Sequence, residues 1–189
     1  MSVKKMASQK KIAVFGSSQP APESRAYEEA RQVGFALAGA GWAVVNGGYR
    51  GVMEASALGA KEAGGITIGV TTGTLAARGV TANPYIDTEI TVSTYGERLL
   101  KLTGMADGYV VMRGGSGTLT EFFHVWELVK NRSLPRRPIV LFGAHWRRIM
   151  ECLDAELADE AAFARFQHLL AYAVDPGEAV AVFRRHFGT

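Results

Sequence analysis

Residues 109–130 read YVVMRGGSGTLTEFFHVWELVK, and this stretch decides the fold. Its first four residues are an apolar run of strand length, residues 113–117 are rich in glycine, and residues 118–130 have apolar side chains at helical spacing. A buried strand, a glycine turn and an amphipathic helix in this order are typical of a parallel strand that leads into a crossover helix. We therefore predict an α/β protein.

The same alternation continues along the chain. Short apolar runs predict further strands, and most segments between them have helical periodicity. One helix opens at Pro22 and Glu23 and ends at Gly39. We expect a doubly wound, mostly parallel sheet with helices on both faces. The predicted strands are residues 12–15, 42–45, 66–70, 90–92, 109–112, 139–142 and 169–174, and the other predicted helices are residues 51–63, 94–106, 118–130, 149–157 and 177–187.

Residues 71–87 break this pattern. Gly73, Gly79 and Pro84 interrupt any regular periodicity, so we expect a long connection without an element of its own. Such loops often carry function, and this one is a candidate lid over a binding site.

The composition fits one globular domain. The chain has 189 residues, of which 48% are hydrophobic and 21% charged, and this excludes a disordered or collagen-like chain. We expect a flexible basic tail at residues 1–10 and a single domain at residues 11–189. The single cysteine, Cys152, cannot form an intramolecular disulfide, which favours a reducing, cytoplasmic setting. His124 and His145 have no metal-ligand spacing with cysteine or acidic residues, so no metal site is predicted.

The charge balance and hydropathy argue against two classes of partner. Lys and Arg number 21 and Asp and Glu 18, a net charge of +3 that is too small to favour nonspecific nucleic-acid binding. No run approaches the roughly 18 apolar residues that span a bilayer, so no membrane partner is expected. The pairs Arg136-Arg137, Arg147-Arg148 and Arg184-Arg185 are expected to face water.

Three loops that follow predicted strands are rich in glycine or hydroxyl residues: residues 16–18 (GSS), 46–51 (NGGYRG) and 113–118 (RGGSGT). Ligands of doubly wound sheets bind beyond the carboxyl ends of the strands, where these loops lie. Glycine lets the backbone approach a ligand oxygen, and free amides at a helix start favour an anion, so a phosphate is expected. The alternative is that each turn needs glycine for its geometry alone. The candidate binding residues are Gly16, Ser17, Gly47, Gly48, Gly51, Gly114, Gly115, Ser116, Gly117 and Thr118.

Two common phosphate-binding motifs do not occur. A P-loop requires Lys and then Ser or Thr after its last glycine, whereas Thr118 and Leu119 follow Gly117. The dinucleotide fingerprint Gly-x-Gly-x-x-Gly follows no predicted strand, and Asn46 stands where an acidic residue would bind a ribose. A mononucleotide or another phosphate monoester remains as the ligand, and no cofactor is predicted.

Glu121 is the strongest candidate for chemistry. It lies in the first turn of the helix predicted to start at Thr118, beside the expected phosphate. The spacing Thr118-x-x-Glu121 also matches a capping box, in which the Glu side chain only reaches back to the helix start. Thr94-x-x-Glu97 has the same form without a glycine loop, and we interpret it as a cap. Arg98 follows at the same edge of the sheet, where it either meets the ligand or remains a solvated arginine.

Residues 113–121 (RGGSGTLTE) resemble the PGGxGTxxE motif of the LOG family, the cytokinin-activating phosphoribohydrolases. Residues 15–18 (FGSS) are similar to the first-strand loop of that family, and residues 47–53 (GGYRGVM) to its GGGxxGLM segment, which adds Met53 to the candidate binding residues. Residues 95–98 (YGER) are similar to the start of its RK pair. The resemblance covers most of the chain. Residues 52–55 (VMEA) are also similar to relatives that carry the molybdenum cofactor, a phosphorylated pterin.

The resemblance implies a Rossmann-like homodimer whose residues 11–189 form a nucleotide-binding domain. It implies hydrolysis of the N-glycosidic bond of a nucleoside 5′-monophosphate, such as a cytokinin riboside monophosphate or AMP, to a free base and ribose 5-phosphate. The Glu121 carboxylate would stabilise positive charge at C1′ and orient or deprotonate water. Arg98 would bind phosphate or ribose and keep Glu121 ionised. Residues 114–118 would hold the phosphate.

Four positions depart from the family pattern. Arg113 replaces a proline, Asn46 a glycine and Leu99 the lysine of the RK pair, and Gly79 lies near the place of a substrate-contacting glutamate. The loss of a cation and a carboxylate leaves the identity of the base or ligand open. Three hypotheses remain: a phosphoribohydrolase, a carrier or sensor that binds a phosphorylated ligand such as the molybdenum cofactor or a signalling nucleotide, and a scaffold with a vestigial site.

Overall fold

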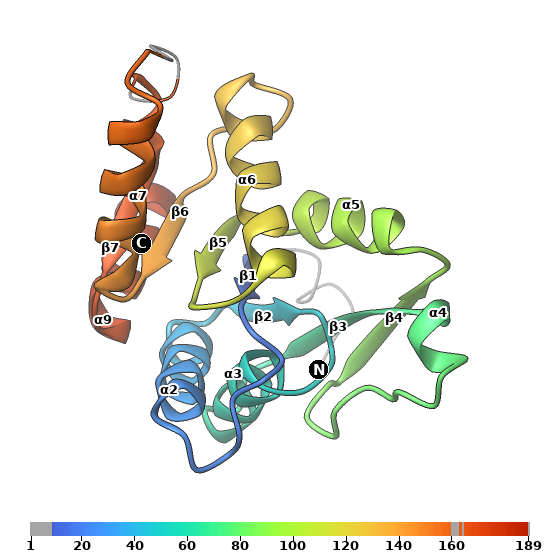
Figure 1. The fold of residues 1–189 in the computed structure, drawn as a ribbon. Helices are drawn as coiled ribbons and strands as arrows, with labels where there is room; N and C mark the ends of the chain where they lie inside the picture. Colours follow the sequence, from blue (N-terminus) through green and yellow to red (C-terminus); the bar gives the residue numbers. More distant parts are fainter. Residues whose placement is uncertain (1–8, 160–162, 164, 189) are drawn as a thin grey trace.

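The computed structural model describes residues 9–159, 163 and 165–188. Their strands form one sheet in the order β4-β3-β2-β1-β5-β6-β7, and every neighbouring pair is parallel (Figure 1). The predicted α/β class and the doubly wound, Rossmann-like sheet are confirmed. The strands are β1 (Lys11–Phe15), β2 (Ala43–Asn46), β3 (Thr67–Thr72), β4 (Thr88–Val92), β5 (Gly108–Val111), β6 (Ile139–Phe142) and β7 (Leu170–Ala173).

The direction of strand addition reverses at β1. Strands β1 to β4 follow one another toward one edge, and β5 then pairs with the opposite side of β1. Ile12 is in register with Val44 on one side and with Gly108 on the other. The loops that leave β1 and β5 therefore diverge at the carboxyl ends of these strands, where doubly wound sheets form a crevice.

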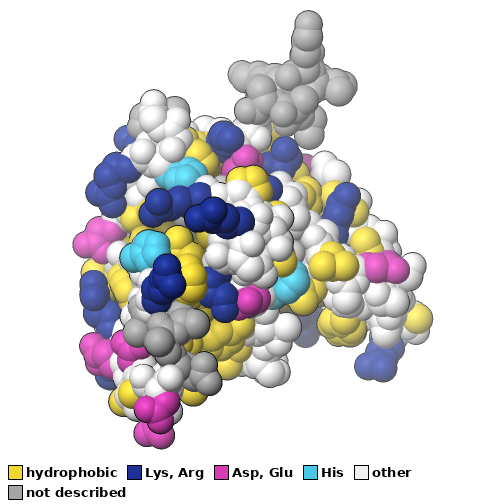
Figure 2. All heavy atoms as spheres, turned by 90° about the horizontal axis from the view of Figure 1, so that it is seen from above, with side chains coloured by type: hydrophobic (Ala, Val, Ile, Leu, Met, Phe, Trp, Pro, Cys, Tyr) yellow, Lys and Arg dark blue, Asp and Glu magenta, His cyan; other side chains and the backbone are white. Residues whose placement is uncertain are grey.

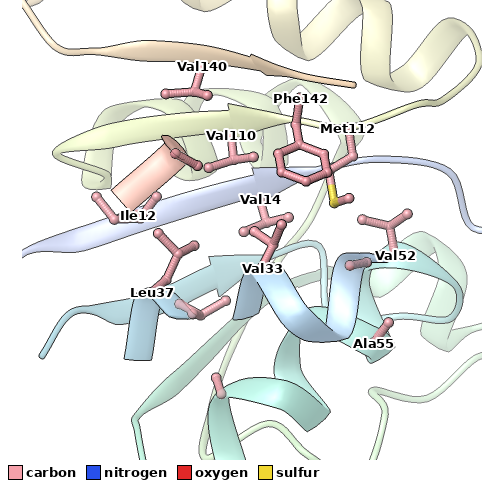
Figure 3. Close-up of a cluster of buried hydrophobic side chains, with 14 of the residues drawn as sticks. Ile12, Val14, Val33, Leu37, Val52, Ala55, Val110, Met112, Val140 and Phe142 are labelled. Carbon is pink, nitrogen blue, oxygen red and sulfur yellow. The ribbon is translucent and has the colours of Figure 1, made fainter. Parts of the chain in front are cut away.

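Helices cover both faces of the sheet, as predicted. Strand side chains point alternately to the two faces, so Ile12 and Val14 belong to one hydrophobic core and Ala13 and Phe15 to the other. Figure 3 shows the first core, in which Val14 faces α2 and α3. The helices on this face are α2 (Arg25–Gly39), α3 (Val52–Glu62) and α9 (Pro176–Phe187), and those on the other face are α5 (Tyr95–Met105), α6 (Ser116–Lys130) and α7 (His145–Glu156).

The first helix starts later than predicted. α2 begins at Arg25, because the Ser24 hydroxyl caps it by accepting a hydrogen bond from the Tyr27 amide at 3.2 Å. Pro22 and Glu23 therefore precede the helix, and the prediction that they open it was wrong.

The connection between β3 and β4 contains a short helix, α4 (Gly73–Ala76). The Thr72 hydroxyl caps α4 by accepting a hydrogen bond from the Leu75 amide at 3.3 Å. We expected no element between residues 71 and 87, so this prediction was wrong. Both flanking strands are also longer than predicted: β3 continues to Thr72, and β4 begins at Thr88.

Residues 1–8 of the predicted N-terminal tail lie outside the described residues. The next two residues contact the domain. The Gln9 side-chain amide donates to the Gly41 carbonyl at 2.8 Å, and the Lys10 ammonium lies 3.1 Å from the Asp107 carboxylate. Gln9 and Lys10, the last two residues of the predicted tail, therefore contact the folded domain.

Lys and Arg side chains are prominent on the face shown in Figure 2. Five of the paired arginines are exposed, as predicted, but Arg137 is not. Its Nη1 donates to the carbonyl oxygens of Thr103 at 3.2 Å and Gly104 at 3.1 Å, in the last turn of α5. Within the described part of the chain, no helix has the length and apolar character needed to cross a membrane.

The backbones of α2 and α3 touch at two glycines. A Cβ on Gly34 would lie 2.0 Å from the Ser56 carbonyl oxygen, and a Cβ on Gly59 would lie 1.8 Å from the Arg31 carbonyl oxygen. Because α3 follows directly from the second glycine loop, this contact fixes the position of that loop relative to the sheet.

Gly34→Ala is expected to lower the free energy of unfolding by about 1–3 kcal/mol, because a backbone carbonyl must move to admit the methyl group. Gly39→Ala on the same helix is the matched control, since nothing lies within 4 Å of its added Cβ. We expect the control to be unchanged or up to about 1 kcal/mol more stable. Urea unfolding measures both variants, and equal stabilities would contradict the close packing of α2 on α3.

Candidate functional site

A pocket of about 1180 Å³ lies at the carboxyl ends of the strands, beside the β1–β5 reversal. The three predicted loops and the starts of α3, α5 and α6 form its walls. The structure thus brings together most of the predicted site residues. Those that line the pocket are Gly16, Ser17, Gly47, Gly51, Met53, Arg98, Gly115, Ser116, Gly117, Thr118 and Glu121.

The backbone of Ser17 ties the three loops to one another. Its amide donates to the Arg113 carbonyl at 3.1 Å, and its carbonyl accepts from the Val52 amide at 2.9 Å. The approach leaves no room for side chains: a Cβ on Gly51 would lie 2.5 Å from the Ser17 carbonyl oxygen, and one on Gly16 would lie 2.5 Å from the Val52 side chain. Glycine at these positions lets three separate segments share one wall.

The start of α6 presents backbone amides to the pocket. The helix begins at Ser116, two residues earlier than predicted, and its N-cap Gly115 provides no side-chain cap. The first amide with an intrahelical partner is that of Leu119, which donates to the Gly115 carbonyl at 3.0 Å. Among the described residues, no acceptor binds the amides of residues 116–118. Three free amides at the positive end of a helix have the geometry and the partial charge that favour an anion such as phosphate.

Ser116 is the first residue of α6, a position where proline fits a helix because its amide has no intrahelical partner. Ser116→Pro therefore removes one of the free amides and retains the helix. We expect its affinity for inorganic phosphate to fall about tenfold below that of Ser116→Ala, which keeps the amide, because one hydrogen bond to a charged group is lost. Isothermal titration calorimetry measures both affinities. Equal values would show that the Ser116 amide does not bind the anion.

Two predicted binding residues, Gly48 and Gly114, do not line the pocket. The Gly48 amide donates to the Asn46 side chain at 2.8 Å, and its carbonyl accepts from the Asn83 amide at 2.8 Å, so both backbone groups are occupied. A Cβ on Gly114 would lie 2.0 Å from the Thr118 hydroxyl. These two glycines shape their loops, which is the alternative that the sequence had left open for them.

Glu121 and Arg98 meet inside the pocket. Arg98 Nη1 lies 3.5 Å from Glu121 Oε1, and the two side chains are 12% and 14% exposed. Because α6 starts at Ser116, Glu121 lies in the second turn and cannot form the capping box with Thr118. The similar motif on α5 is a cap, as predicted: the Thr94 hydroxyl accepts from the Glu97 amide at 3.1 Å.

Other groups hold the Arg98 side chain in place. Its Nε donates to the Val70 carbonyl at 2.8 Å, its Nη2 lies 3.7 Å from the Met53 sulfur, and its Cζ lies 5.6 Å from the centre of the Tyr49 ring. A Cβ on Gly47 would lie 1.6 Å from Nη2. The guanidinium is thus enclosed by protein groups, with Nη1 toward Glu121, and it does not have the reach of a solvated arginine.

Burial raises the pKa of Glu121 to about 7, and the positive charge of Arg98 lowers this pKa only in part. Arg98 favours the ionised form of Glu121, as we expected, but removal of the carboxylate from water raises the pKa by more than the attraction of this one cation lowers it. Near neutral pH, Glu121 therefore exists in both protonation states, which suits a group that gains or loses a proton.

The raised pKa of Glu121 makes stability depend on pH. Between pH 4.5 and 7 the unfolded chain releases the proton and the folded chain retains it, so stability falls as pH rises. Glu121→Gln cannot ionise, and its stability relative to wild type is expected to rise by about 3 kcal/mol over this range and then level off. Urea unfolding of both proteins at pH 4.5, 6, 7.5 and 8.5 checks this. A constant difference would contradict the raised pKa.

Further residues line the pocket that the sequence reasoning missed. Tyr49 and Arg50 lie within the second glycine loop, and Glu54 follows it on α3. Their position in a recognised loop was the signal that could have found them. The connection between β3 and β4 reaches the pocket, as expected for the candidate lid, through Leu75, Gly79, Val80 and Thr81. Tyr95 and residues 18–22 also line the pocket.

The departures from the LOG pattern differ in their relation to the pocket. Gly79 lines it, whereas Leu99 and Arg113 do not. The Asn46 side chain donates to the Met53 carbonyl at 2.8 Å and ties the end of β2 to α3.

The described residues contain no group of three or more His, Cys, Asp and Glu side chains that could hold a metal ion.

Comparison with known proteins agrees with the resemblance found in the sequence. The sequence model of the SLOG cluster4 family matches residues 9–160, and the chain belongs to this family. The cytokinin riboside 5′-monophosphate phosphoribohydrolase of Mycobacterium tuberculosis is 36% identical over 116 residues, which are 61% of this chain and 61% of that protein. The similarity to this relative therefore covers less than two thirds of its length.

Two solved structures share the whole fold. The molybdenum cofactor binding protein of the phototrophic bacterium Rippkaea orientalis has a TM-score of 0.73 at 23% identity, covering 95% of this chain and 98% of that one. The Moco carrier protein of Chlamydomonas reinhardtii has a TM-score of 0.68 at 25% identity, with the same two coverages.

Proposed function

We propose that the protein hydrolyses the N-glycosidic bond of a nucleoside 5′-monophosphate to a free base and ribose 5-phosphate. The observation that carries this proposal is the buried carboxylate of Glu121 on the same helix, and in the same pocket, as three free amides. Glu121 lies five residues beyond Ser116, about 7 Å along the helix axis. A phosphate on the amides would direct its attached ribose toward this carboxylate.

The reaction would proceed by loss of the base and attack of water. As the bond from C1′ to the base nitrogen breaks, its electron pair leaves with the base and positive charge develops at C1′. The Glu121 carboxylate stabilises this charge and accepts a proton from the water whose oxygen bonds to C1′. The departing base takes up a proton from solvent, and Glu121 then releases to solvent the proton that it accepted, so one water is consumed in total. Arg98 favours the ionised form of Glu121, which burial alone would disfavour.

The 36% identical relative carries the name of an enzyme of this class, which supports the proposal. The base is the part that the pocket leaves open, because Gly79 places no carboxylate at the wall where the family pattern has a glutamate. A prenylated adenine is therefore one of several bases to test.

The homodimer and the cytoplasmic location remain predictions. Three exposed apolar side chains could contribute to a dimer interface: Tyr95 and Leu100 on α5 and Phe123 on α6.

Incubation with AMP, prenylated AMP and a panel of pyrimidine monophosphates, followed by chromatography of the released base, tests the proposal. Glu121→Gln is expected to lower kcat/KM about 10²- to 10⁴-fold, as for loss of a general base. In the wild type, kcat/KM is expected to rise with pH to a plateau with a midpoint near 7, because the carboxylate is the active form. If the wild type and Glu121→Gln are equally inert on every nucleotide, the hydrolase proposal fails.

A second candidate is a carrier that binds a phosphorylated ligand without turnover. The observation in its favour is the similarity to the Moco carrier protein over 95% of the chain, together with Leu99 at the place of a lysine in the hydrolase pattern. The same amides of α6 would hold the phosphate of the ligand. A rise in melting temperature with a phosphorylated pterin, with no product formed from any nucleotide, would favour the carrier.

A further inference from the structure

Arg98 lies on α5 and Glu121 on α6, so other residues must hold the long Arg98 side chain in the orientation that reaches Glu121. It extends from α5 to β3, where its Nε donates to the Val70 carbonyl at 2.8 Å. This hydrogen bond holds one edge of the guanidinium. It does not by itself determine which way Nη1 and Nη2 point, because the group can still swing about the bond.

Tyr49 provides a rigid surface for the guanidinium. Its ring centre lies 5.6 Å from Arg98 Cζ, within the range of a cation–π contact, and the residue is only 8% exposed. The Tyr49 hydroxyl accepts a hydrogen bond from the Thr72 amide at 2.9 Å, and its carbonyl accepts from the Asn83 side chain at 2.9 Å. Both ends of Tyr49 are therefore anchored, and β3 holds Tyr49 and Arg98 through residues two positions apart.

The charges around Glu121 make the contact between Tyr49 and Arg98 important. Among the described residues, Arg98 is the cation within ion-pair distance of Glu121. Arg50 and Glu54 face the same pocket from the β2–α3 segment, His124 follows one turn later on α6, and residues 16–22 bring no charge. A shift of Arg98 would leave the buried carboxylate without its nearby positive charge.

We propose that Tyr49 is a positioning residue that holds the Arg98 guanidinium against the Glu121 carboxylate. A role of Tyr49 in catalysis rests on the proposed hydrolase function, but the contact between Tyr49 and Arg98 can be tested without turnover. Loss of the ring releases the guanidinium, so the carboxylate becomes harder to ionise. Tyr49 acts through Arg98 and need not touch the substrate.

The test follows the titration of Glu121 by NMR in protein labelled with ¹³C at the glutamate carboxyls, with the Glu121 signal assigned by its loss in Glu121→Gln. Arg98→Met gives the full effect of removing the cation, a rise in the midpoint. Tyr49→Leu is expected to show about half of that rise or more, and Tyr49→Phe, which keeps the ring, a smaller one. Tyr172→Leu is the matched control, because it removes a similar ring contact, 4.6 Å from Arg147, on β7.

An unchanged Glu121 midpoint in folded Tyr49→Leu would overturn the proposal, and so would an equal shift in Tyr172→Leu. Should Tyr49→Leu fail to fold, phenylalanine and pentafluorophenylalanine at position 49 are compared, since fluorination keeps the shape of the ring and removes its attraction for a cation. The midpoint is expected to be higher with the fluorinated ring, and equal midpoints would refute the role of Tyr49. If the midpoint shifts but no nucleotide is hydrolysed, the positioning role stands and the hydrolase function fails.

Discussion

The two hydrogen bonds of the Ser17 backbone hold the pocket together. One reaches the loop after β5 and the other the start of α3, so three segments that are distant in sequence share one wall. This closeness is possible because Gly16 and Gly51 have no side chains at the contact. These contacts place the start of α6 and the start of α3 on the same wall of the pocket.

Among the helix starts at the pocket, those of α3 and α6 differ in their local chemistry. At α3, the Val52 amide is already bound to the Ser17 carbonyl, and Glu54 places a carboxylate in the first turn. At α6, the first turn has neither a side-chain cap nor an acidic residue. The start of α6 is therefore the more favourable of the two for an anion, while α3 offers a carboxylate that can accept hydrogen bonds from neutral or cationic donors.

The pKa of Glu121, which burial raises and Arg98 lowers, bears on both candidate functions. A carboxyl group removed from water and opposed by one cation has a pKa close to neutral, which suits a group that exchanges a proton with water. A carrier would use the same free amides for the phosphate but would not need the carboxylate to change its protonation state. The two proposals therefore differ in what they require of Glu121 and share the same amides of α6.

The local pattern of the sequence was sufficient for the class of fold, the position of the strands and the three loops at their carboxyl ends, because alternation of apolar runs and helical stripes depends only on neighbouring residues. It also identified Glu121 and Arg98 as candidates. It misplaced the starts of α2 and α6 and overlooked α4, because hydrogen bonds of one or two capping groups decide such boundaries.

Tertiary structure decided the rest. Gly48 and Gly114 look the same in the sequence as Gly47 and Gly115, and only the packing shows which pair lies behind the wall and which lines the pocket. The protonation of Glu121 is likewise set by burial and by an arginine from another helix, which no local spacing reveals. The sequence alone thus determined the order of the strands and of the longer helices and where a phosphate is expected, since these follow from short-range patterns. The roles of individual residues depend on distances between segments far apart in the chain, and only the folded structure provides those distances.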